Sequence, residues 1–464
     1  MPWRDAPATS RGSAGRCAFP GRAQATSRRR NVKKALVVGT GGVGQSIASI
    51  AKRRDPNGEW LEKMVMADYD GRRAADFVAT LQDPRYVGEQ VDASDADAVA
   101  ALADKHGVDI LMNLCAPNFN PPLLQAALKA KVHYLDTAMT LSEWHPTDPF
   151  RKTGKKLGDD EYALDEDFKK IGKYALAGFG VEPGMADFFA RYAADHLFDE
   201  VDYIGIRDGS NLEIPGAEGI SFGFSVWTTI EECNNPAVVF EDGDWHTIEP
   251  FAELETFWLP EGIGEVEVGH VEHEEVIQIG HNRDRLKGVK KADFKYALGD
   301  EFMQFMSALR SINMDRAEKI RVGGVEVAPR DVIAAAAPDP NEIGRQYVGK
   351  TAAGTYVVGK KDGMERKVYL YQVADNEECL ETVGVQVVTA QTGFTPVIAL
   401  ELLATGSLGS KPGDPKAGVQ NPEAFNADEY VALMPKVGFP GGLLEMESEY
   451  KIAKDRQALL DLAD

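Results

Sequence analysis

The sequence has few cysteines and no long apolar run, and both absences limit what the chain can be. Its four cysteines, at positions 17, 115, 233 and 379, lie far apart without a CxxC pair, so neither a disulfide framework nor a cysteine zinc site is implied. Reduced thiols in a cytosol-like compartment are the simplest interpretation. No apolar run approaches the ~18 residues that a spanning helix needs, which excludes a membrane protein.

Basic residues are outnumbered by acidic ones. The chain has 51 Lys and Arg against 73 Asp and Glu, a formal net charge of -22. Such a charge repels nucleic acid and attracts cations, so no nucleic-acid partner is expected. A solvated acidic surface that serves solubility alone is the alternative explanation.

Residues 1–31 differ from the rest in composition. They are rich in Arg, Ser and Ala, contain one acid, and lack the apolar core of a secretory signal. The segment is compatible with an organelle transit peptide in a eukaryote, with a start codon assigned too early, or with a disordered tail. Otherwise we expect a cytoplasmic protein.

The first half of the chain carries a dinucleotide-binding pattern. The apolar run 34–38 predicts a buried parallel strand, a GxGxxG turn follows at once, and QSIASIAKRR then predicts a helix. Such a turn lets the backbone approach a pyrophosphate at the amino end of the helix. The residues that we assign to the cofactor here are Gly39, Gly41, Gly42, Val43 and Gly44.

A second strand, residues 64–68, ends in an acid that follows Gly44 by 24 residues. Asp68 is placed to accept hydrogen bonds from a ribose 2′-hydroxyl, which favours NAD. Because Arg72 and Arg73 lie close enough to reach a 2′-phosphate, NADP stays open as the cofactor.

Strands and helices continue to alternate after this strand, which predicts a doubly wound parallel sheet with its ligand at the carboxyl ends of the strands. Residues 92–93 follow a third strand, where an adenine edge usually lies. Loops 113–117, 136–138 and 179–182 should face the nicotinamide and the substrate. The further cofactor candidates are Asp92, Ala93, Asn113, Cys115, Ala116, Pro117, Thr137, Ala138 and Gly180.

From about residue 187 the pattern changes to strands with few crossover helices. Residues 201–207, 238–240, 265–271 and 274–280 are all interpreted as strands, which predicts a largely antiparallel sheet in an α+β second domain. A hairpin is expected around GKKDG at 359–363. We therefore expect a Rossmann domain at 32–186, a substrate-binding and dimerisation domain at 187–385, and a segment 386–464 that packs back on the Rossmann domain.

Three motif matches are discounted. Residues 344–351 satisfy GxxxxGK[ST], but Pro-rich sequence precedes them and a strand-like run follows, whereas a phosphate loop needs a strand before it and a helix after it. The YxxxK match at 356–360 lies inside the expected hairpin. His270 and His273 would point to opposite faces of a strand, so no metal site is predicted.

Several segments together resemble the saccharopine dehydrogenase family, and in places its carboxynorspermidine dehydrogenase branch. The resemblance covers nearly all of residues 33–445 and rests on segments that occur in the same order. It implies an NAD(P)-binding first domain, an inserted domain that forms the substrate cleft and often a dimer interface, and the reversible reduction of an imine to a secondary amine. The segments are the glycine turn, QAALKAKVHYLDT at 125–137, GVEPG at 180–184, 336–340, GKKDGMER at 359–366, Ala374-Asp375 and QTGFTP at 391–396.

The chain departs from the family at several positions, which leaves the substrate open. Residues 67–70 lack the Ser-Arg-Thr-like pattern of members that use NADP. Fungal saccharopine reductases have Asp at position 182, where this chain has Glu, and a Cys near position 207 that is absent here. Residues 227–233 match neither branch closely.

For a reaction through a cationic imine, carboxylates are suitable catalytic groups. They stabilise the developing positive charge and transfer a proton to or from the amine. Our candidates for the catalytic groups are Glu182, Asp208, Glu232 and His273. Trp227 could cover a cationic methylene chain by cation–π contact, with core packing as its alternative. Arg207 and Arg283 are the candidates for binding a substrate carboxylate.

The acidic composition favours an amine of the carboxynorspermidine or carboxyspermidine type over saccharopine, which carries three carboxylates. Two other functions stay open: a homospermidine synthase-like transferase that holds NAD as a prosthetic group, and a dinucleotide sensor without turnover. The expected partner is a small amine or amino-acid substrate, and the expected assembly is a homodimer.

Overall fold

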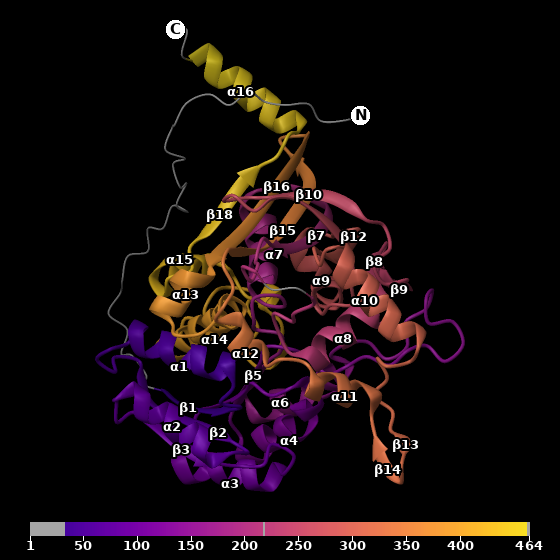
Figure 1. Cartoon of the computed structure of the whole chain (residues 1–464). Coiled ribbons are helices and arrows are strands. Elements are labelled where there is room, and N and C mark those ends of the chain that lie inside the picture. The colour runs from indigo at the N-terminus through magenta and orange to yellow at the C-terminus, as the bar shows by residue number, and fades with distance from the viewer. Residues whose placement is uncertain (1–32, 217–218, 462–464) are drawn as a thin grey trace.

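The structure is a computed structural model that describes residues 33–216 and 219–461. Its first half is built on a parallel seven-stranded sheet, in the lower part of Figure 1, with strand order β17-β6-β5-β4-β1-β2-β3. This is the doubly wound sheet that the sequence predicts. The strands are β1 (Lys33–Val38), β2 (Leu61–Asp68), β3 (Tyr86–Gln90), β4 (Ile110–Asn113), β5 (His133–Asp136), β6 (Tyr174–Leu176) and β17 (Gly418–Gln420).

Helices cover both faces of this sheet because its strands are apolar on both sides. α1 (Gly42–Arg54) packs with α14 (Val387–Thr405) on one face, and α3 (Ala96–His106) packs with α4 (Asn120–Ala130) on the other. Local caps set the ends of α3: Asp95 accepts from the N–H groups of residues 97 and 98, and Gly107 ends the helix with a φ of 60°. The remaining elements of this half are α2 (Gly71–Leu81), η1 (Pro117–Phe119), α5 (Asp159–Ala163) and α6 (Asp165–Ile171).

The second half is built on a mixed, largely antiparallel nine-stranded sheet. Its longest pair, β15 and β16, is the hairpin expected from the sequence, and Asp362 and Gly363 at its turn both have positive φ. The strands are β7 (Glu200–Ser210), β8 (Ala237–Glu241), β9 (Asp244–Ile248), β10 (Glu255–Leu259), β11 (Gly264–His270), β12 (Lys291–Tyr296), β15 (Lys350–Lys361), β16 (Met364–Asp375) and β18 (Gly441–Glu445).

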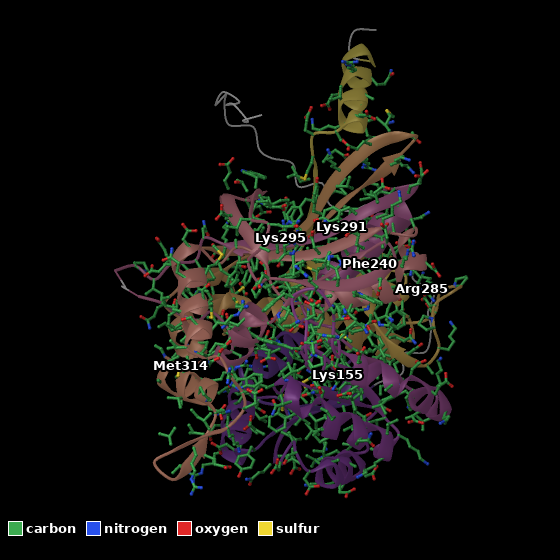
Figure 2. All side chains as sticks on the ribbon, turned by 90° about the vertical axis from the view of Figure 1, so that its right-hand side faces the viewer. Lys155, Phe240, Arg285, Lys291, Lys295 and Met314 are labelled. Carbon is green, nitrogen blue, oxygen red and sulfur yellow. The ribbon has the colours of Figure 1, made fainter. Side chains whose placement is uncertain are left out.

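Helices and a small hairpin accompany this second sheet. One apolar core runs without a break from the first sheet into the second, and Figure 2 shows side chains filling the region between them. The elements are α7 (Met185–His196), α8 (Val226–Asn234), α9 (Glu275–His281), η2 (Arg283–Leu286), α10 (Asp300–Ser311), β13 (Ile320–Val322), β14 (Val325–Val327), α11 (Pro329–Ala336), α12 (Pro340–Gly344) and α13 (Asn376–Thr382).

The chain after residue 385 contributes to both sheets. β17 pairs with β6 in the first sheet, whereas β18 pairs with β16 at the edge of the second. The segment therefore does not pack on the Rossmann sheet alone. Its other elements are α14, η3 (Pro422–Ala424), α15 (Asp428–Val437) and α16 (Glu449–Asp461), and Figure 1 shows α16 projecting from the end of the second sheet.

Helix α14 is long and apolar enough to cross a membrane by length and composition, with a mean hydropathy of 1.4. However, 89% of that window is buried inside the fold. A helix that is apolar on all sides belongs either in a membrane or in the centre of a large core, and α14 lies in the core between the two halves.

Two of the sequence interpretations are tested directly by these elements. The expected strand 274–280 is wrong, since residues 275–281 form helix α9. Val276, Ile277 and Ile279 are all buried, and three apolar residues in so short a segment do not distinguish a strand from a helix by their periodicity. Rejecting a phosphate loop at 344–351 is confirmed, because the strand β15 begins at Lys350.

Candidate active site

The glycine turn joins β1 to α1 in a form that only glycine allows at two positions. Gly39 has a φ of +103°, and a Cβ on Gly44 would lie 2.1 Å from the carbonyl oxygen of Gly39. β1 and α1 can therefore approach each other this closely only because positions 39 and 44 carry no side chain.

The amino end of α1 is open in the way that a pyrophosphate requires. Gly41 is the N-cap residue and makes no side-chain cap, and the first turn, with Gly42 and Val43, contains no acid. A Cβ built on Gly41 would meet nothing within 4 Å. Backbone N–H groups at a free helix N-terminus attract a phosphate anion, so these residues fit the diphosphate of a dinucleotide.

Asp68 lies beside this turn at the end of β2. One carboxylate oxygen accepts from the backbone N–H of Thr40 at 2.9 Å, and the other accepts from the N–H of Asp70 at 2.9 Å. Arg73 approaches the same carboxylate at 3.8 Å. The side chain is thus fixed next to the diphosphate cradle, where the ribose of a dinucleotide lies.

The other cofactor candidates divide into accessible and structural residues. Asp92 is exposed and its carboxylate accepts from the backbone N–H and hydroxyl of Ser94, which lowers its pKa; Ala93 beside it is half-buried. In the loop after β4, Ala116 is exposed and Pro117 is buried at the start of η1. Cys115 has an Sγ only 3.5 Å from the carbonyl oxygen of Val38, and burial raises its pKa to about 12, so it stays a neutral thiol.

Asn113 does not contact a cofactor through its side chain, contrary to the sequence interpretation. Its amide nitrogen donates to Asn120 at 2.7 Å and to the Tyr134 hydroxyl at 2.9 Å, and its oxygen accepts from the N–H of Cys115. With 1% of its surface exposed, Asn113 instead holds the loop that follows β4.

The loops after β5 and β6 meet. Thr137 and Ala138 are half-buried, and a Cβ on Gly180 would lie 3.2 Å from the carbonyl oxygen of Thr137. This contact places the expected nicotinamide-facing residues next to Glu182, which follows two positions after Gly180.

The four catalytic candidates come from four separate segments and converge. Glu182 precedes α7, Asp208 lies on β7, Glu232 on α8, and His273 in the loop between β11 and α9. The carboxyl groups of Glu182 and Asp208 lie next to each other, and His273 lies close enough to influence both Asp208 and Glu232. No local pattern in the sequence predicts that these four segments lie together.

Burial dominates the electrostatics of these carboxyls. It raises the pKa of Glu182 well above its usual range, with the neighbouring Asp208 adding to the effect. It raises the pKa of Asp208 to about 7 and that of Glu232 to about 8. Asp208 is 3% exposed, whereas Glu182 and Glu232 are half-buried, so these two form the accessible side of the group.

His273 is held as a cation. Burial by itself lowers its pKa, but Glu275, with Glu274 and Glu232, raises the pKa to about 10. Its Nδ1 lies 2.5 Å from Oε2 of Glu275, and its ring stacks on Phe294 with centroids 3.9 Å apart. A buried imidazolium is stabilised by this pairing.

Sequence reasoning missed several members of this cluster. Glu272 accepts from Asn235 at 2.8 Å and burial raises its pKa to about 7, while Glu274 accepts from the N–H of Met139 at 3.0 Å. His273, Glu274 and Glu275 bring atoms that could bind a metal within 4.8 Å of one another. The signal was the run EHEE at 272–275, which the incorrect strand assignment spread over two faces.

A second buried carboxyl pair lies nearby. The carboxyl groups of Asp187 on α7 and Glu423 in η3 are fully buried neighbours, and the charge of Glu275 raises the pKa of both. Burial raises the pKa of Asp187 well above its usual range and that of Glu423 to about 7. Such a pair shares a proton at neutral pH.

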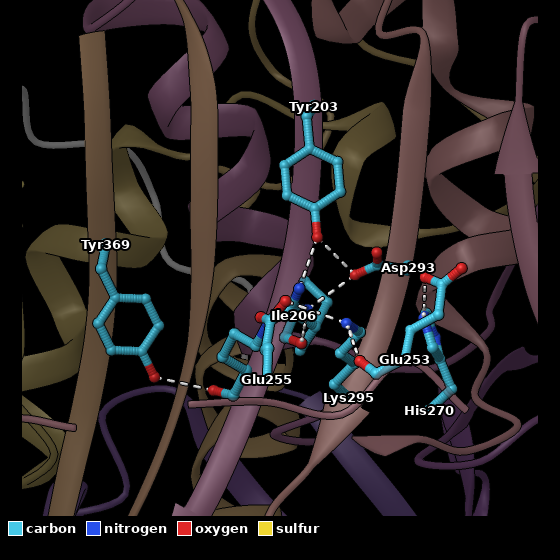
Figure 3. A network of polar contacts seen from close by, with 9 residues as sticks. Tyr203, Ile206, Glu253, Glu255, His270, Asp293, Lys295 and Tyr369 are labelled. Carbon is cyan, nitrogen blue, oxygen red and sulfur yellow. Dashed lines mark hydrogen bonds and ion pairs between the residues drawn. The ribbon is translucent and has the colours of Figure 1, made fainter. Parts of the chain in front are cut away.

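Arg207 is not available to a substrate, which corrects the sequence interpretation. Its guanidinium donates to Glu255 at 2.6 Å, to Asp293 at 2.7 Å and to the Tyr203 hydroxyl at 2.6 Å, as Figure 3 shows around these residues, and 1% of it is exposed. Neighbouring residues of a strand point to opposite faces of the sheet. Arg207 therefore points away from the face that carries Asp208.

The two other substrate candidates have neighbours from the chain itself. The guanidinium of Arg330 lies over the Trp227 ring at 4.5 Å and also pairs with Glu231, so Trp227 already has a cationic partner. Arg283 lies in η2 and points to the turn between β8 and β9, where its Nη1 is 3.0 Å from the position of a Cβ on Gly243.

Two family models match the chain, one over each of the two halves described above. Residues 35–176 match the family model "Saccharopine dehydrogenase NADP binding domain", and residues 180–438 match "Saccharopine dehydrogenase C-terminal domain". The chain is 28% identical over 426 residues to a carboxynorspermidine synthase of Vibrio alginolyticus, covering 89% of this chain and 97% of that protein. It is 28% identical over 410 residues to a carboxyaminopropylagmatine dehydrogenase of Synechocystis, covering 88% and 96%.

Among solved structures, the fold is similar to that of the apo saccharopine dehydrogenase (L-Glu forming) of Saccharomyces cerevisiae. The TM-score is 0.62, over 89% of this chain and 100% of that chain, at 14% sequence identity. At this identity the likeness concerns the fold.

Proposed function

The chain belongs to the saccharopine dehydrogenase family, and from that membership we propose that it reduces the imine formed between an amino-acid semialdehyde and an aliphatic di- or polyamine, of the carboxynorspermidine or carboxyspermidine type. It is an NAD(P)-dependent oxidoreductase that acts on a carbon–nitrogen bond, with a nicotinamide dinucleotide as cofactor.

The buried acid cluster carries the proposal. Glu182, Asp208 and Glu232 offer three carboxyls to the space beside the expected nicotinamide, and Arg207 points away from it. A polyamine imine has several positive charges and one carboxylate, which such a cluster favours, whereas saccharopine has three carboxylates and would need arginines facing inward. The names of the two relatives, which refer to amine products, agree with this choice.

The proposed chemistry requires one proton and one hydride per imine. When bound, the nicotinamide supplies the hydride. The Glu182–Asp208 pair holds a proton at neutral pH because burial raises both pKa values, and it is placed to give that proton to the imine nitrogen. Glu232, whose pKa of about 8 keeps it mostly protonated in the free protein, ionises when a cation lies beside it and then stabilises the positive charge on the protonated imine.

His273 and Glu275 serve as a fixed ion pair behind these groups. The imidazolium lowers the cost of ionising Asp208 and Glu232, since its charge lowers both pKa values.

For the cofactor we propose NAD. Asp68 supports this choice, because a carboxylate beside the glycine turn accepts from ribose hydroxyls and repels a 2′-phosphate. Arg73 at 3.8 Å from Asp68 favours NADP instead, so both cofactors must be measured.

The deciding experiment follows nucleotide absorbance with aspartate semialdehyde plus 1,3-diaminopropane, putrescine or agmatine, using NADH and NADPH separately. We expect NADH consumption that depends on both the semialdehyde and the amine. Formation of NADH from NAD with saccharopine, without NADH consumption in the semialdehyde and amine assays, would contradict the substrate class. Conversion of two diamines without nucleotide consumption would identify a transferase, and binding without any turnover would identify a sensor.

The expected homodimer and cytoplasmic location remain proposals. Sedimentation of the full chain tests the first, and fractionation of cells tests the second. The alternatives for residues 1–31 lie outside the residues that the structure describes.

A further inference from the structure

The register of the second sheet places Tyr296 beside Asp208. Tyr296 is the last residue of β12, and its direct partner on the parallel strand β7 is Asp208. Side chains of directly paired residues on neighbouring strands point to the same face of a sheet, and residues two apart on one strand also share a face. Phe294, two positions before Tyr296, stacks its ring on His273. Both relations place the Tyr296 side chain on the face that carries the acid cluster.

The hydroxyl of Tyr296 is unpaired and accessible. It makes no hydrogen bond with another described residue, and its oxygen is not closed off from solvent. The side chain as a whole is half-buried. Tyr203, on the opposite face of the sheet, differs because its hydroxyl donates to Asp293 at 2.7 Å (Figure 3). Tyr296 thus presents a free hydroxyl to the space beside the acid cluster.

The surroundings of this hydroxyl keep it neutral. Burial, together with the negative charges of Asp208 and Glu182, raises the pKa of Tyr296 well above its usual range, and Glu232 adds to the effect. A neutral phenol has one O–H donor and can also accept through its oxygen. It can therefore donate to a carboxylate of the cluster and accept a hydrogen bond from a ligand at the same time.

An N–H group of a cationic chain is the ligand donor that fits this position. The carboxyls attract a cation through charge, which acts over several ångströms and does not fix the position of a nitrogen atom. A hydroxyl accepts only from a donor at hydrogen-bond distance, and a site built to bind an N–H rejects an analogue that lacks it. The carboxyls thus supply affinity for the chain, and the hydroxyl determines where along it the nitrogen must lie.

We propose that Tyr296 is a substrate-binding residue whose hydroxyl accepts from the internal N–H of the amine chain, the nitrogen of the reduced C–N bond. The inference rests on the proposed function, in which the Glu182–Asp208 pair gives its proton to that same nitrogen. Because Tyr296 adjoins Asp208 in the sheet, one position of the nitrogen serves both contacts. The contact persists through the reaction, since the protonated imine and the product ammonium each carry an N–H.

Two linear amines of equal length test this contact by calorimetric titration of the full chain. 1,8-Diaminooctane has a methylene in place of the internal NH of spermidine and keeps both terminal ammonium groups. We expect the wild type to bind spermidine more tightly than 1,8-diaminooctane by about tenfold or more, the effect of a hydrogen bond to a charged group.

Tyr296→Phe keeps the ring and removes only the hydroxyl. It should weaken the binding of spermidine by about tenfold or more and leave the binding of 1,8-diaminooctane unchanged. The midpoint of thermal unfolding should not change, because the hydroxyl has no partner among the described residues. Tyr356→Phe is the matched control and should change neither affinity: Tyr356 is also half-buried, but it pairs with Gly205, on the face of the sheet that carries Arg207.

Three results overturn the proposal. They are equal affinities of the wild type for the two amines, a spermidine affinity that Tyr296→Phe does not change, and a loss in Tyr296→Phe that is the same for both amines, which would indicate a structural role. Failure of the proposed function is recognised separately, by a wild type that consumes no nucleotide with any semialdehyde and amine. A loss confined to spermidine in Tyr296→Phe would in that case still support recognition of the N–H by Tyr296.

Discussion

The carboxyl groups of Glu182 and Asp208 are direct neighbours although the two residues come from different halves of the fold, and each has a buried oxygen without another hydrogen-bond partner among the described residues. Glu182 follows the last strand of the first sheet before α7, and Asp208 lies on β7 of the second. Two carboxyls in contact cannot both be ionised at low energetic cost, so the pair keeps a proton at neutral pH.

Replacing either carboxyl should remove the proton donor. We expect Asp208→Asn and Glu182→Gln to lower kcat/KM for imine reduction by about 10²- to 10⁴-fold, the usual contribution of a general acid. The fall in rate at the higher pH where the pair loses its last proton should disappear. The pH profile of kcat/KM measures both effects, with the exposed Glu267→Gln as control; an unchanged profile would refute the role.

Asp68 should determine the choice of nucleotide. In Asp68→Ser the affinity for NADH should fall by about tenfold or more, because a charged acceptor for the ribose is lost. The affinity for NADPH should rise, since Arg73 is released from the carboxylate. Fluorescence titration with both nucleotides measures the change, and the exposed Asp76→Asn on α2 is the control. Equal losses for both nucleotides would contradict the assignment.

His273 should stabilise the protein in a defined pH range. Its folded pKa of about 10 lies above the ordinary value of 6.5, so its contribution is fully present below pH 6.5 and is lost as pH rises to about 10. Relative to the wild type, His273→Gln should therefore lose most stability at pH 6 and least at pH 10. Urea unfolding at several pH values measures this; a difference that does not depend on pH would argue against a buried imidazolium.

Glu423 should lower the stability with rising pH in the same direction, but over a more acidic range. Its folded pKa of about 7 exceeds the ordinary value of 4.5, so the folded state loses stability as pH rises from about 4.5 to about 7, by about 3 kcal/mol. Glu423→Gln cannot ionise and should flatten this part of the stability curve. Thermal unfolding between pH 4.5 and 8 tests the expectation, and the exposed Glu267→Gln should behave as the wild type.

Arg207 should be a structural residue. Arg207→Met leaves Asp293 buried without its partner, which should lower the free energy of unfolding by about 3–5 kcal/mol. The KM for the amine should stay the same within about twofold, since the side chain points away from Asp208. An increase in KM without a loss of stability would restore Arg207 as a substrate ligand.

The parts of the site that could be predicted from the sequence are those encoded locally. The glycine turn, its strand and its helix are contiguous, and Asp68 follows at a fixed spacing, so periodicity and turn chemistry were sufficient. The adjacency of Arg207 and Asp208 also indicated that only one of them faces the site, because neighbouring residues of a strand point to opposite faces. This was not applied when both residues were assigned to the site.

The acid cluster could be found only in part. Residues 182, 208, 232 and 273 were proposed one by one from the charge of the intermediate, and no pattern in the sequence brings four such distant segments together. Glu274 and Glu275 were missed because so short a segment, with apolar residues only at positions 276, 277 and 279, fits a buried strand as well as a buried helix. Glu423 lies near the cluster because the chain returns to the first sheet as β17, and η3, which contains Glu423, follows this strand directly.

The placement of β17 and β18 in different sheets has a consequence for biosynthesis. During translation, the first sheet lacks its edge strand until residue 420 has emerged, and the second lacks its own until residue 445. Both sheets therefore stay incomplete until late in translation, and a nascent chain stopped at residue 400 would expose an unpaired edge on each, where other chains can add.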